Sequence, residues 1–337
     1  MKHVIIPVFV PHKGCPFDCI YCNQKKISGQ VDDMSVAKMQ QIIESHISTL
    51  DNAASLEIGF FGGSFTGIDK KEQISYLEEA NKYISAGMVD GIRLSTRPDY
   101  ISEEILAYLK EYNVKIIELG VQSLDETILK ITCRGHNSEN VIKSAKLIKE
   151  HGFKLGIQTM IGLPGDSKEK DLETARSVVE LCPDLVRIYP TLVIKGTYLE
   201  EMMKKGEYTP LTLDEAVEIS AELLELYEAN NINVIRVGLQ PTDTINEGFD
   251  VAGGPFHPAF RQLAEARLGY KQIRKIINEK NLSFEKFITI YTGSKKLDSV
   301  IGQKRENIIK LKEEYGFNRI EVKTDPSLNK EIIVEKS

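Results

Sequence analysis

The sequence predicts an α/β protein, with a partial (β/α)6-type barrel of parallel strands followed by a small α+β extension at the carboxyl end. Three observations support this prediction. Short apolar segments alternate with segments of helical periodicity, polar residues share one face of several expected strands, and the alternation stops near residue 245. The 337 residues are enough for about two domains. We therefore expect a barrel over residues 1–245 and an extension over residues 246–337.

Seven short apolar runs predict the strands of the barrel. Each is too short for a helix of ordinary length and is followed by a longer segment of different periodicity. The predicted strands are His3–Val10, Leu56–Phe61, Gly91–Thr96, Lys115–Val121, Phe153–Ile161, Asp184–Tyr189 and Ile232–Gly238.

The segments between these runs predict helices, because apolar residues recur in them at three- and four-residue spacing, several behind Ser or Thr caps. Strand–helix repetition implies parallel strands joined by right-handed crossovers. The predicted helices are Ser35–Leu50, Lys70–Ser85, Ser102–Tyr112, Ser138–His151, Lys168–Leu181 and Thr212–Asn230.

Polar residues on one face of the strands predict an active-site lumen. In the fourth strand Glu118 and Gln122 lie on one face, and apolar residues occupy the other. A barrel whose centre is only structural fills it with Val, Ile and Leu, so polar side chains there favour a binding site. The lumen residues that we expect to meet a substrate are Glu118, Arg187, Tyr189 and Arg236.

The carboxyl end has a different pattern. The Gly- and Pro-rich stretch Gly248–Pro258 predicts a loop. The segments after it predict a helix, a strand, a helical segment and two strands, which are Ala259–Glu279, Phe287–Tyr291, Ser294–Tyr315, Arg319–Lys323 and Glu331–Glu335.

The composition excludes several classes of protein. Hydrophobic residues make up 42% and charged residues 27% of the chain, as in ordinary globular proteins. No apolar run approaches the ~20 residues of a membrane span, and Met1 to Val10 is too short for the apolar region of a signal peptide. Five cysteines, an odd number, argue against a disulfide framework. We therefore expect a cytoplasmic protein that does not act on a membrane.

Three cysteines form a C-x-x-x-C-x-x-C motif directly after the first predicted strand. These are Cys15, Cys19 and Cys22. Three thiolates on one loop can bind three irons of a 4Fe-4S cluster, which leaves the fourth iron open to a ligand. The alternative is a zinc site completed by His12 or another residue, but structural zinc sites favour paired C-x-x-C elements and the chain has no second pair.

A cysteine loop of this spacing after the first strand of a partial α/β barrel resembles that of the radical S-adenosylmethionine enzymes. The resemblance implies that the open iron binds S-adenosylmethionine and that Tyr21 packs near the adenine. It continues in GFFGGSFTG, where Gly62, Gly63 and Ser64 match a glycine-rich motif that meets the methionine amino group. Glycine suits this position because it lets the backbone approach a ligand closely.

Further segments are similar to the radical SAM domain of the elongator catalytic subunit and, less closely, to oxygen-independent coproporphyrinogen III oxidase. In GVQSLDETILKITCRGHN, Gln122 matches a position that contacts the nucleoside. Arg134 matches an arginine that pairs with the ligand carboxylate, a task that its planar fork suits. In QTMIGLPGD, Gln158 begins the segment that matches the turn after the fifth strand, and we include it among the cofactor-binding residues.

The resemblance spans about residues 4–240, with departures. Ser95 stands where those families have a glutamate near the end of the third strand. The residues after 240 are too few for the acetyltransferase domain of the elongator subunit, so we expect no reaction with acetyl-CoA within this chain.

The resemblance implies an oxygen-sensitive enzyme that uses a 4Fe-4S cluster and S-adenosyl-L-methionine. Reductive cleavage would release a 5′-deoxyadenosyl radical, which abstracts hydrogen from a substrate, and flavodoxin or ferredoxin would supply the electron. Two alternatives stay open: the same chemistry on a small molecule such as a porphyrinogen, and a cysteine-ligated binding module without turnover.

The basic tail suggests an RNA substrate. Residues 261–337 contain 17 Lys and Arg against 11 Asp and Glu, whereas the whole chain has a net charge of −6. Within residues 285–337, the segment Lys295–Gly316 resembles the core of a KH domain, whose glycine loop binds a nucleic-acid backbone. Lys304 and Arg305 lie in that turn and could meet phosphates of tRNA or another RNA. We expect no DNA partner, and a purely structural cover for the barrel is the alternative for this segment.

Overall fold

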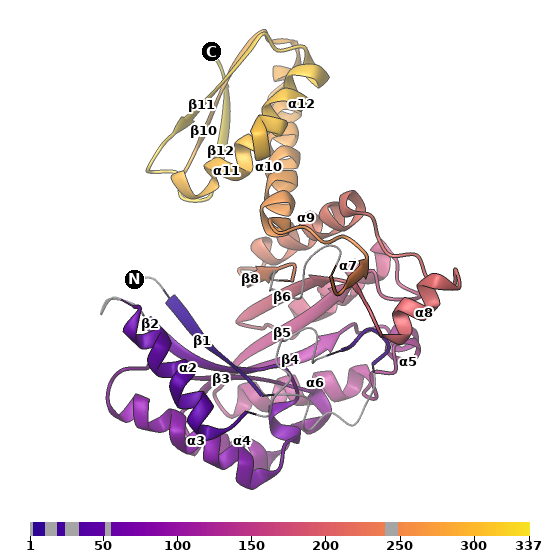
Figure 1. Cartoon of the computed structure of the whole chain (residues 1–337). Coiled ribbons are helices and arrows are strands. Elements are labelled where there is room, and N and C mark those ends of the chain that lie inside the picture. Colours follow the sequence, from indigo (N-terminus) through magenta and orange to yellow (C-terminus); the bar gives the residue numbers. More distant parts are fainter. Residues whose placement is uncertain (1–2, 11–18, 24–33, 51–54, 240–248) are drawn as a thin grey trace. The chain divides into compact units, whose positions relative to one another are not determined.

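The computed structural model describes residues 3–10, 19–23, 34–50, 55–239 and 249–337 (Figure 1). Its contacts divide the chain into two compact units. The first contains residues 1–211 and 230–256, and the second contains residues 212–229 and 257–337. No described helix combines the length and the apolar character that crossing a membrane requires.

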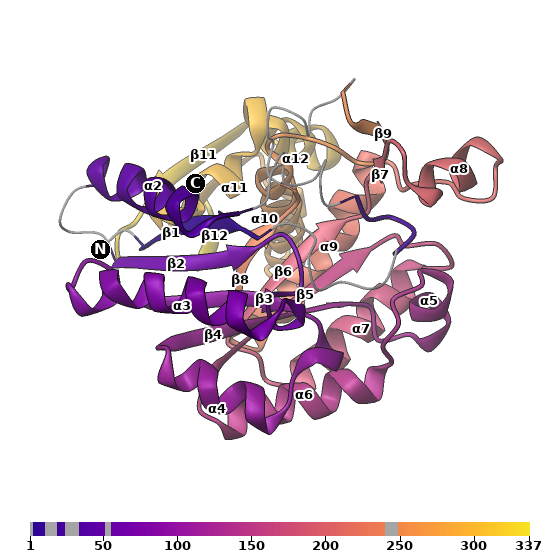
Figure 2. The same ribbon diagram turned by 60° about the horizontal axis from the view of Figure 1, so that its bottom comes forward.

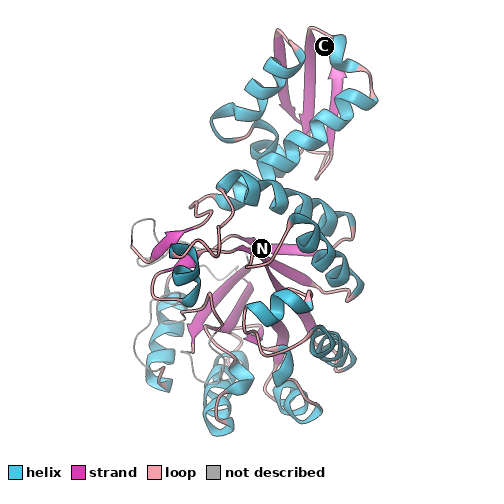
Figure 3. Cartoon of the chain, turned by 90° about the vertical axis from the view of Figure 1, so that its right-hand side faces the viewer, coloured by secondary structure: helices cyan, strands magenta, loops and turns pink. Residues whose placement is uncertain are grey.

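The first unit is built on a seven-stranded sheet of order β1-β2-β3-β4-β5-β6-β8. All neighbouring strands are parallel, and the sheet curls into a half-barrel (Figure 3). The predicted partial α/β barrel is therefore confirmed. Its strands are β1 (His3–Phe9), β2 (Ser55–Phe61), β3 (Gly91–Thr96), β4 (Val114–Gln122), β5 (Lys154–Ile161), β6 (Leu185–Pro190) and β8 (Asn233–Val237).

Helices cover the outer face of the half-barrel, with α3, α4, α6 and α7 in a row along the sheet (Figure 2). The predicted Ser35 cap is present, since its hydroxyl accepts a hydrogen bond from the Lys38 amide. Asn137, which was not predicted as a cap, forms a capping box with Asn140 at the start of α6. The helices of this unit are α2 (Val36–Ser48), α3 (Lys70–Ser85), α4 (Glu103–Glu111), α5 (Glu126–Ile131), α6 (Ser138–Glu150), α7 (Lys168–Glu180) and α8 (Tyr198–Lys204), with 3-10 turns at Phe65–Gly67 and Pro98–Tyr100.

The apolar core lies between the sheet and these helices. In β4, Ile117, Leu119 and Val121 are fully buried, and Leu77 of α3 and Leu106 of α4 are also fully buried. Because successive side chains of a strand point to opposite faces, this arrangement sends Glu118 and Gln122 to the inner, concave side. The core thus fixes which residues face the lumen.

The expected loop at Gly248–Pro258 contains a short strand that the sequence did not predict. β9 (Val251–Gly253) pairs antiparallel with β7 (Val193–Ile194). A strand of two or three residues is too short to produce a periodic signal. Because Gly253 and Gly254 lie at the end of β9, the composition of this segment predicted a turn instead.

After α9, the second unit has the predicted helix, strand, helical segment and two strands, and the helical segment is divided into two helices, α11 and α12. β10 pairs parallel with β11 and antiparallel with β12, in a sheet of order β11-β10-β12. Its elements are α9 (Leu213–Ala229), α10 (Phe260–Glu279), β10 (Phe287–Thr292), α11 (Leu297–Ile301), α12 (Glu306–Tyr315), β11 (Arg319–Thr324) and β12 (Ile332–Lys336), with 3-10 turns at Leu282–Phe284, Ser294–Lys296 and Gln303–Arg305.

Ion pairs join α9 to α10 within the second unit. Arg267 lies 2.5 Å from Asp214 and 2.6 Å from Glu218, and Lys271 lies 2.7 Å from Glu222. Behind them, Ile273 and other buried residues of α10 pack against the sheet. The acidic residues of α9 therefore neutralise part of the positive charge of α10.

Candidate active site

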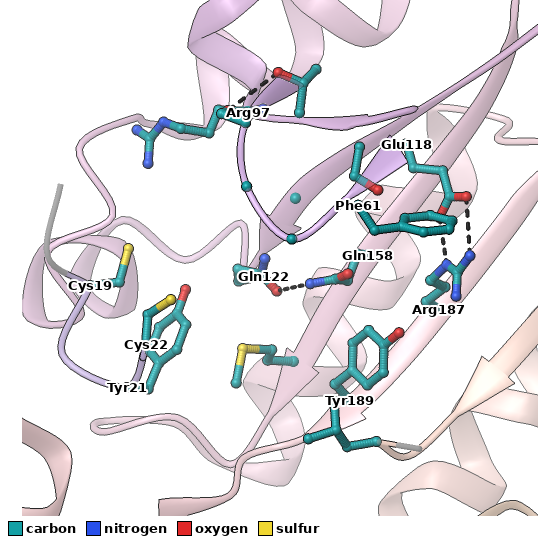
Figure 4. A pocket seen from close by; sticks show the side chains of 18 of the residues that line it. Cys19, Tyr21, Cys22, Phe61, Arg97, Glu118, Gln122, Gln158, Arg187 and Tyr189 are labelled. Carbon is teal, nitrogen blue, oxygen red and sulfur yellow. Dashed lines mark hydrogen bonds and ion pairs between the residues drawn. The ribbon is translucent and has the colours of Figure 1, made fainter. Parts of the chain in front are cut away.

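A cavity of about 560 Å³ lies in the first unit, on the concave side of the half-barrel. This volume is within the range of sites that bind drug-sized ligands. Residues at the carboxyl ends of several strands line this cavity, such as Phe61, Gln122 and Pro190. Ligands of α/β barrels bind at this end of the strands. Figure 4 shows two groups of side chains in it, with Cys19 and Cys22 in one and Glu118 and Arg187 in the other.

Every described residue that we predicted to bind the cofactors lines this cavity. Cys15, the first predicted ligand, and His12, the zinc alternative, lie outside the described residues. The predicted residues that line the cavity are Cys19, Tyr21, Cys22, Gly62, Gly63, Ser64, Gln122, Arg134 and Gln158.

The described part of the cysteine loop is anchored on two sides. The Ile20 amide donates to the Thr132 carbonyl oxygen at 3.3 Å, and the Leu199 amide donates to the Ile20 carbonyl oxygen at 2.8 Å. Within the loop, the Cys22 amide donates to the Cys19 carbonyl oxygen at 2.9 Å. The loop is therefore fixed to the end of α5 and to the start of α8.

The donor set fits an iron–sulfur cluster. Cys19 and Cys22 both line the cavity, and Cys19 is only 4% exposed. Among the described residues, no group of three or more His, Cys, Asp and Glu side chains could hold a metal, so a third protein ligand would have to come from outside them. Thiolates are the ligands that iron–sulfur clusters take. Burial raises the pKa of the neighbouring Tyr21, whose hydroxyl stays protonated.

The glycine-rich turn after β2 exposes backbone to the cavity. Gly62 adopts a φ of +96°, which disfavours residues with a side chain, and a Cβ there would lie 3.3 Å from the Phe9 ring. The Ser64 hydroxyl accepts a hydrogen bond from the Arg97 amide at 3.0 Å, which ties this turn to the end of β3. Gly63, between them, lines the cavity.

Arg134 reaches the cavity from the turn after α5. Its Nη1 donates a hydrogen bond to Cys19 Sγ at 3.4 Å, and its Nη2 donates to the Gly120 carbonyl oxygen. Arg134 therefore lies beside Cys19, at the cysteine end of the cavity. Its contact with Cys19 could not be predicted, because the two residues are 115 positions apart and no local pattern links them.

Gln122 and Gln158 lie between the two ends of the cavity. The Gln158 amide donates to the Gln122 side-chain oxygen at 3.3 Å (Figure 4). Gln122 has a φ of +71°, and the register between β4 and β5 shifts by one residue just before it. This bulge at the end of β4 positions its side chain, as bulges often do beside active sites.

Glu118 and Arg187 line the opposite end of the cavity and belong to a chain of ion pairs that continues through Arg93 to Glu57. Glu118 lies 3.1 Å from Arg93 and 2.5 Å from Arg187, and Arg93 lies 2.5 Å from Glu57. Burial lowers the pKa of Arg187, but the attraction and hydrogen bonds of Glu118 outweigh it and raise that pKa overall. Each buried charge is therefore paired, as the low dielectric of an interior requires.

Aromatic and further polar side chains complete this end. The Arg187 guanidinium lies over the Phe61 ring, 5.3 Å from its centroid. Tyr189 and Arg236 line the cavity with them, so all four predicted lumen residues face it. Glu57 was not predicted, although its position at period two in β2 would have placed it on the polar face. Ser95, which departs from the related families, also lines the cavity.

The model of the radical SAM superfamily matches residues 9–178, and that of the radical SAM C-terminal domain matches residues 183–269. The chain belongs to the radical SAM superfamily. It is accordingly an enzyme of the radical SAM type, and this family uses S-adenosylmethionine with a 4Fe-4S cluster.

Two curated relatives are similar to part of this chain. A tRNA uridine(34) acetyltransferase from Dehalococcoides mccartyi is 34% identical over 245 residues, which cover 61% of this chain and 53% of that protein. Human Elongator complex protein 3 is 35% identical over 196 residues, 56% of this chain and 35% of that protein. The chain thus spans about a third to a half of the length of these two relatives.

The fold also agrees with that of a solved structure. Archaeal Elp3 from Methanocaldococcus infernus, with residues 1–46 deleted, superposes with a TM-score of 0.63 at 24% identity, over 83% of this chain and 64% of that one. This similarity supports the radical SAM half-barrel as the fold of the first unit.

Proposed function

We propose that this radical SAM protein cleaves S-adenosylmethionine reductively and uses the resulting radical to modify RNA, with a uridine of tRNA as the favoured substrate. The observation that supports this most is a single cavity with two cysteines at one end and a separate polar and aromatic group at the other. Residues 1–245 would perform the chemistry, and residues 246–337 would contact RNA. The proposed location is the cytoplasm.

Cys15, Cys19 and Cys22 would hold the cluster. When bound and reduced, it supplies one electron that splits S-adenosylmethionine into methionine and a 5′-deoxyadenosyl radical. A reduced flavodoxin or ferredoxin is the proposed source of that electron. Cys19 is only 4% exposed, so its thiolate would have little contact with bulk water.

The residues around the cysteines would orient S-adenosylmethionine. The backbone of Gly62 and Gly63 lines the cavity without a side chain in the way, and suits the amino group of the methionine. The Arg134 guanidinium suits the carboxylate, since its planar fork can donate two parallel hydrogen bonds. Gln122 and Tyr21 would contact the adenosine.

The end with Glu118 and Arg187 would receive the substrate. Two arginines neutralise Glu118, so its carboxylate would not repel an anionic or carbonyl-rich group. Phe61 and Tyr189 offer ring surfaces to a planar base. A nucleotide flipped out of its stack would fit such a site better than an intact helix.

The second unit supports an RNA partner. Gly302, Lys304 and Arg305 adopt φ values of +74°, +50° and +64° in the turn between α11 and α12, and both basic side chains are exposed. The order of strand, two helices and two strands is that expected for the KH-like segment. Two relatives are named for their action on tRNA uridine or as elongator proteins. We propose that Lys304 and Arg305 contact RNA phosphates.

Replacing Lys304 and Arg305 with Ala is expected to weaken RNA binding without changing sequence preference, because phosphate contacts do not read bases. The slope of the logarithm of the RNA-binding constant against the logarithm of the salt concentration should become less steep by about 1.4, if two contacts to single-strand phosphates are lost. Filter binding of an anticodon stem-loop at several salt concentrations measures this slope. A Lys275→Ala, Lys330→Ala variant removes two exposed charges elsewhere in the unit and should change the slope less. Equal slopes for the wild type and the Lys304/Arg305 variant would leave this turn without a role in RNA binding.

Arg134→Lys is expected to weaken binding of S-adenosylmethionine by roughly ten- to a hundredfold, because lysine keeps the charge but loses the bidentate geometry. Calorimetry on the reconstituted protein measures the affinity, and iron content shows whether the cluster survives. Unchanged affinity would place the ligand carboxylate elsewhere.

A comparison of nucleosides from total tRNA of cells with and without this protein tests the proposed substrate. A uridine derivative that disappears with the protein supports the proposal. An unchanged nucleoside profile, together with a changed small metabolite, would favour the same chemistry on a small molecule such as a porphyrinogen.

A further inference from the structure

Arg134 contacts a predicted cluster ligand directly. Its Nη1 lies 3.4 Å from Cys19 Sγ, in hydrogen-bonding geometry. Both residues are buried, with 7% of Arg134 and 4% of Cys19 exposed. A positive charge therefore lies against the sulfur at a place with little access to water.

The position of Arg134 is held by several independent contacts. Cys133 ends α5 with a φ of +53°, and the Arg134 amide donates back to the Leu129 carbonyl oxygen at 3.0 Å. Arg97 Nη2 donates to the Arg134 carbonyl oxygen at 2.7 Å. The guanidinium itself donates to the Gly120 carbonyl oxygen.

Gly120 leaves the space that the guanidinium occupies. A Cβ at this position would lie 3.1 Å from Arg134 Nη2 and 3.2 Å from Gln122 Nε2. Any other residue would press on the arginine. The chain thus provides a fitted place for a cation beside Cys19.

A hydrogen bond from a cation to a cluster thiolate changes the reduction potential of the cluster in a known direction. Reduction adds one negative charge to the cluster, and a positively charged donor at a ligand sulfur stabilises that charge. Burial strengthens this interaction, because water does not screen it. A donor at Cys19 therefore raises the reduction potential of the cluster.

We infer that Arg134 is a positioning residue that links ligand binding to the reduction potential of the cluster. Without ligand, its hydrogen bond to Cys19 favours the reduced cluster. A ligand carboxylate that pairs with the same guanidinium neutralises its charge and removes part of this effect. By linkage, reduction of the cluster and binding of the carboxylate then affect each other to the same extent. This inference rests on the proposed function of the cysteine motif.

Potentiometric titration of the reconstituted protein tests the inference. At a fixed applied potential, Arg134→Gln should lower the ratio of reduced to oxidised cluster about tenfold, which is about 59 mV for one electron. Arg236→Gln is the matched control, since it removes an arginine that lines the same cavity and no described contact joins Arg236 to Cys19. It should change the ratio less than the Arg134 variant does.

The ligand effect is measured with S-adenosylhomocysteine, which carries the carboxylate but no sulfonium group to cleave. Saturation with it should lower the potential of the wild type toward that of Arg134→Gln, and should shift the variant less. Gly120→Ala is a second variant that keeps the arginine but presses on its guanidinium. Gly120→Ala should also lower the reduction potential of the cluster. If Arg134→Gln fails to bind iron, Gly120→Ala tests the role of Arg134 in its place.

The outcomes separate this inference from the proposed function. A wild-type protein that binds no reducible cluster would contradict the function itself. A wild type with a full cluster, and variants with equal iron content and the same potential as the wild type, would overturn the role of Arg134 alone.

Discussion

Replacing Cys15, Cys19 and Cys22 together with Ala is expected to abolish iron binding by the anaerobically reconstituted protein. Each thiolate supplies one bond to iron, and nitrogen or oxygen ligands near the loop do not replace three thiolates in such a cluster. The described residues offer no other group of three ligands to take over. Iron and sulfide analysis, together with the visible absorption of the cluster, measure the loss.

The matched control is Cys133→Ala, Cys182→Ala. Both of these cysteines are exposed, and neither lines the cavity. This variant should bind as much iron as the wild type. Iron retained at the wild-type level in the triple variant would disprove the assignment of the cluster ligands.

Glu118→Ala is expected to destabilise the first unit by about 3–5 kcal/mol, because it removes the carboxylate that pairs with buried Arg187 and one of the two that pair with buried Arg93. The Glu118 side chain is 3% exposed, and those of Arg93 and Arg187 are 4% and 10% exposed. Without the carboxylate, both guanidinium groups lose a hydrogen-bonding partner. Glu118→Gln keeps the shape and one acceptor, so its effect should be smaller.

Urea unfolding followed by circular dichroism measures this change, with the midpoint read for the transition of the first unit. Glu104→Ala is the control: Glu104 also pairs with a cation, Lys70 at 2.7 Å, but its side chain is 79% exposed. Exposed ion pairs contribute little, so this variant should unfold close to the wild type. Equal midpoints for Glu118→Ala and Glu104→Ala would show that the buried chain of charges does not stabilise the half-barrel.

Periodicity predicted most of the half-barrel correctly, because long elements repeat their pattern several times. The strand predicted at Lys115–Val121 appears as Val114–Gln122, and the helix predicted at Lys70–Ser85 has those bounds. Period two in β4 also placed Glu118 and Gln122 on the lumen side, where both line the cavity. The local sequence pattern therefore predicted which face of β4 lines the cavity.

Other features depend on contacts between distant residues. The two-residue strand β7 and the seven-residue helix α8 are too short for a clear period, and neither was predicted. The pairing of Arg93 with Glu57 and Glu118 needs the lateral order of three strands, which the pattern of one strand does not contain. The contact of Arg134 with Cys19 forms only when the folded sheet brings the loop after β1 next to the turn after α5.

The formation of 5′-deoxyadenosine tests the central claim most directly. The reconstituted protein would be incubated without oxygen, with S-adenosylmethionine and dithionite, and the products would be quantified by mass spectrometry. We predict equal amounts of 5′-deoxyadenosine and methionine from the wild type and none from the triple cysteine variant. A wild-type protein with a full, reduced cluster and bound S-adenosylmethionine that forms no 5′-deoxyadenosine would contradict the account.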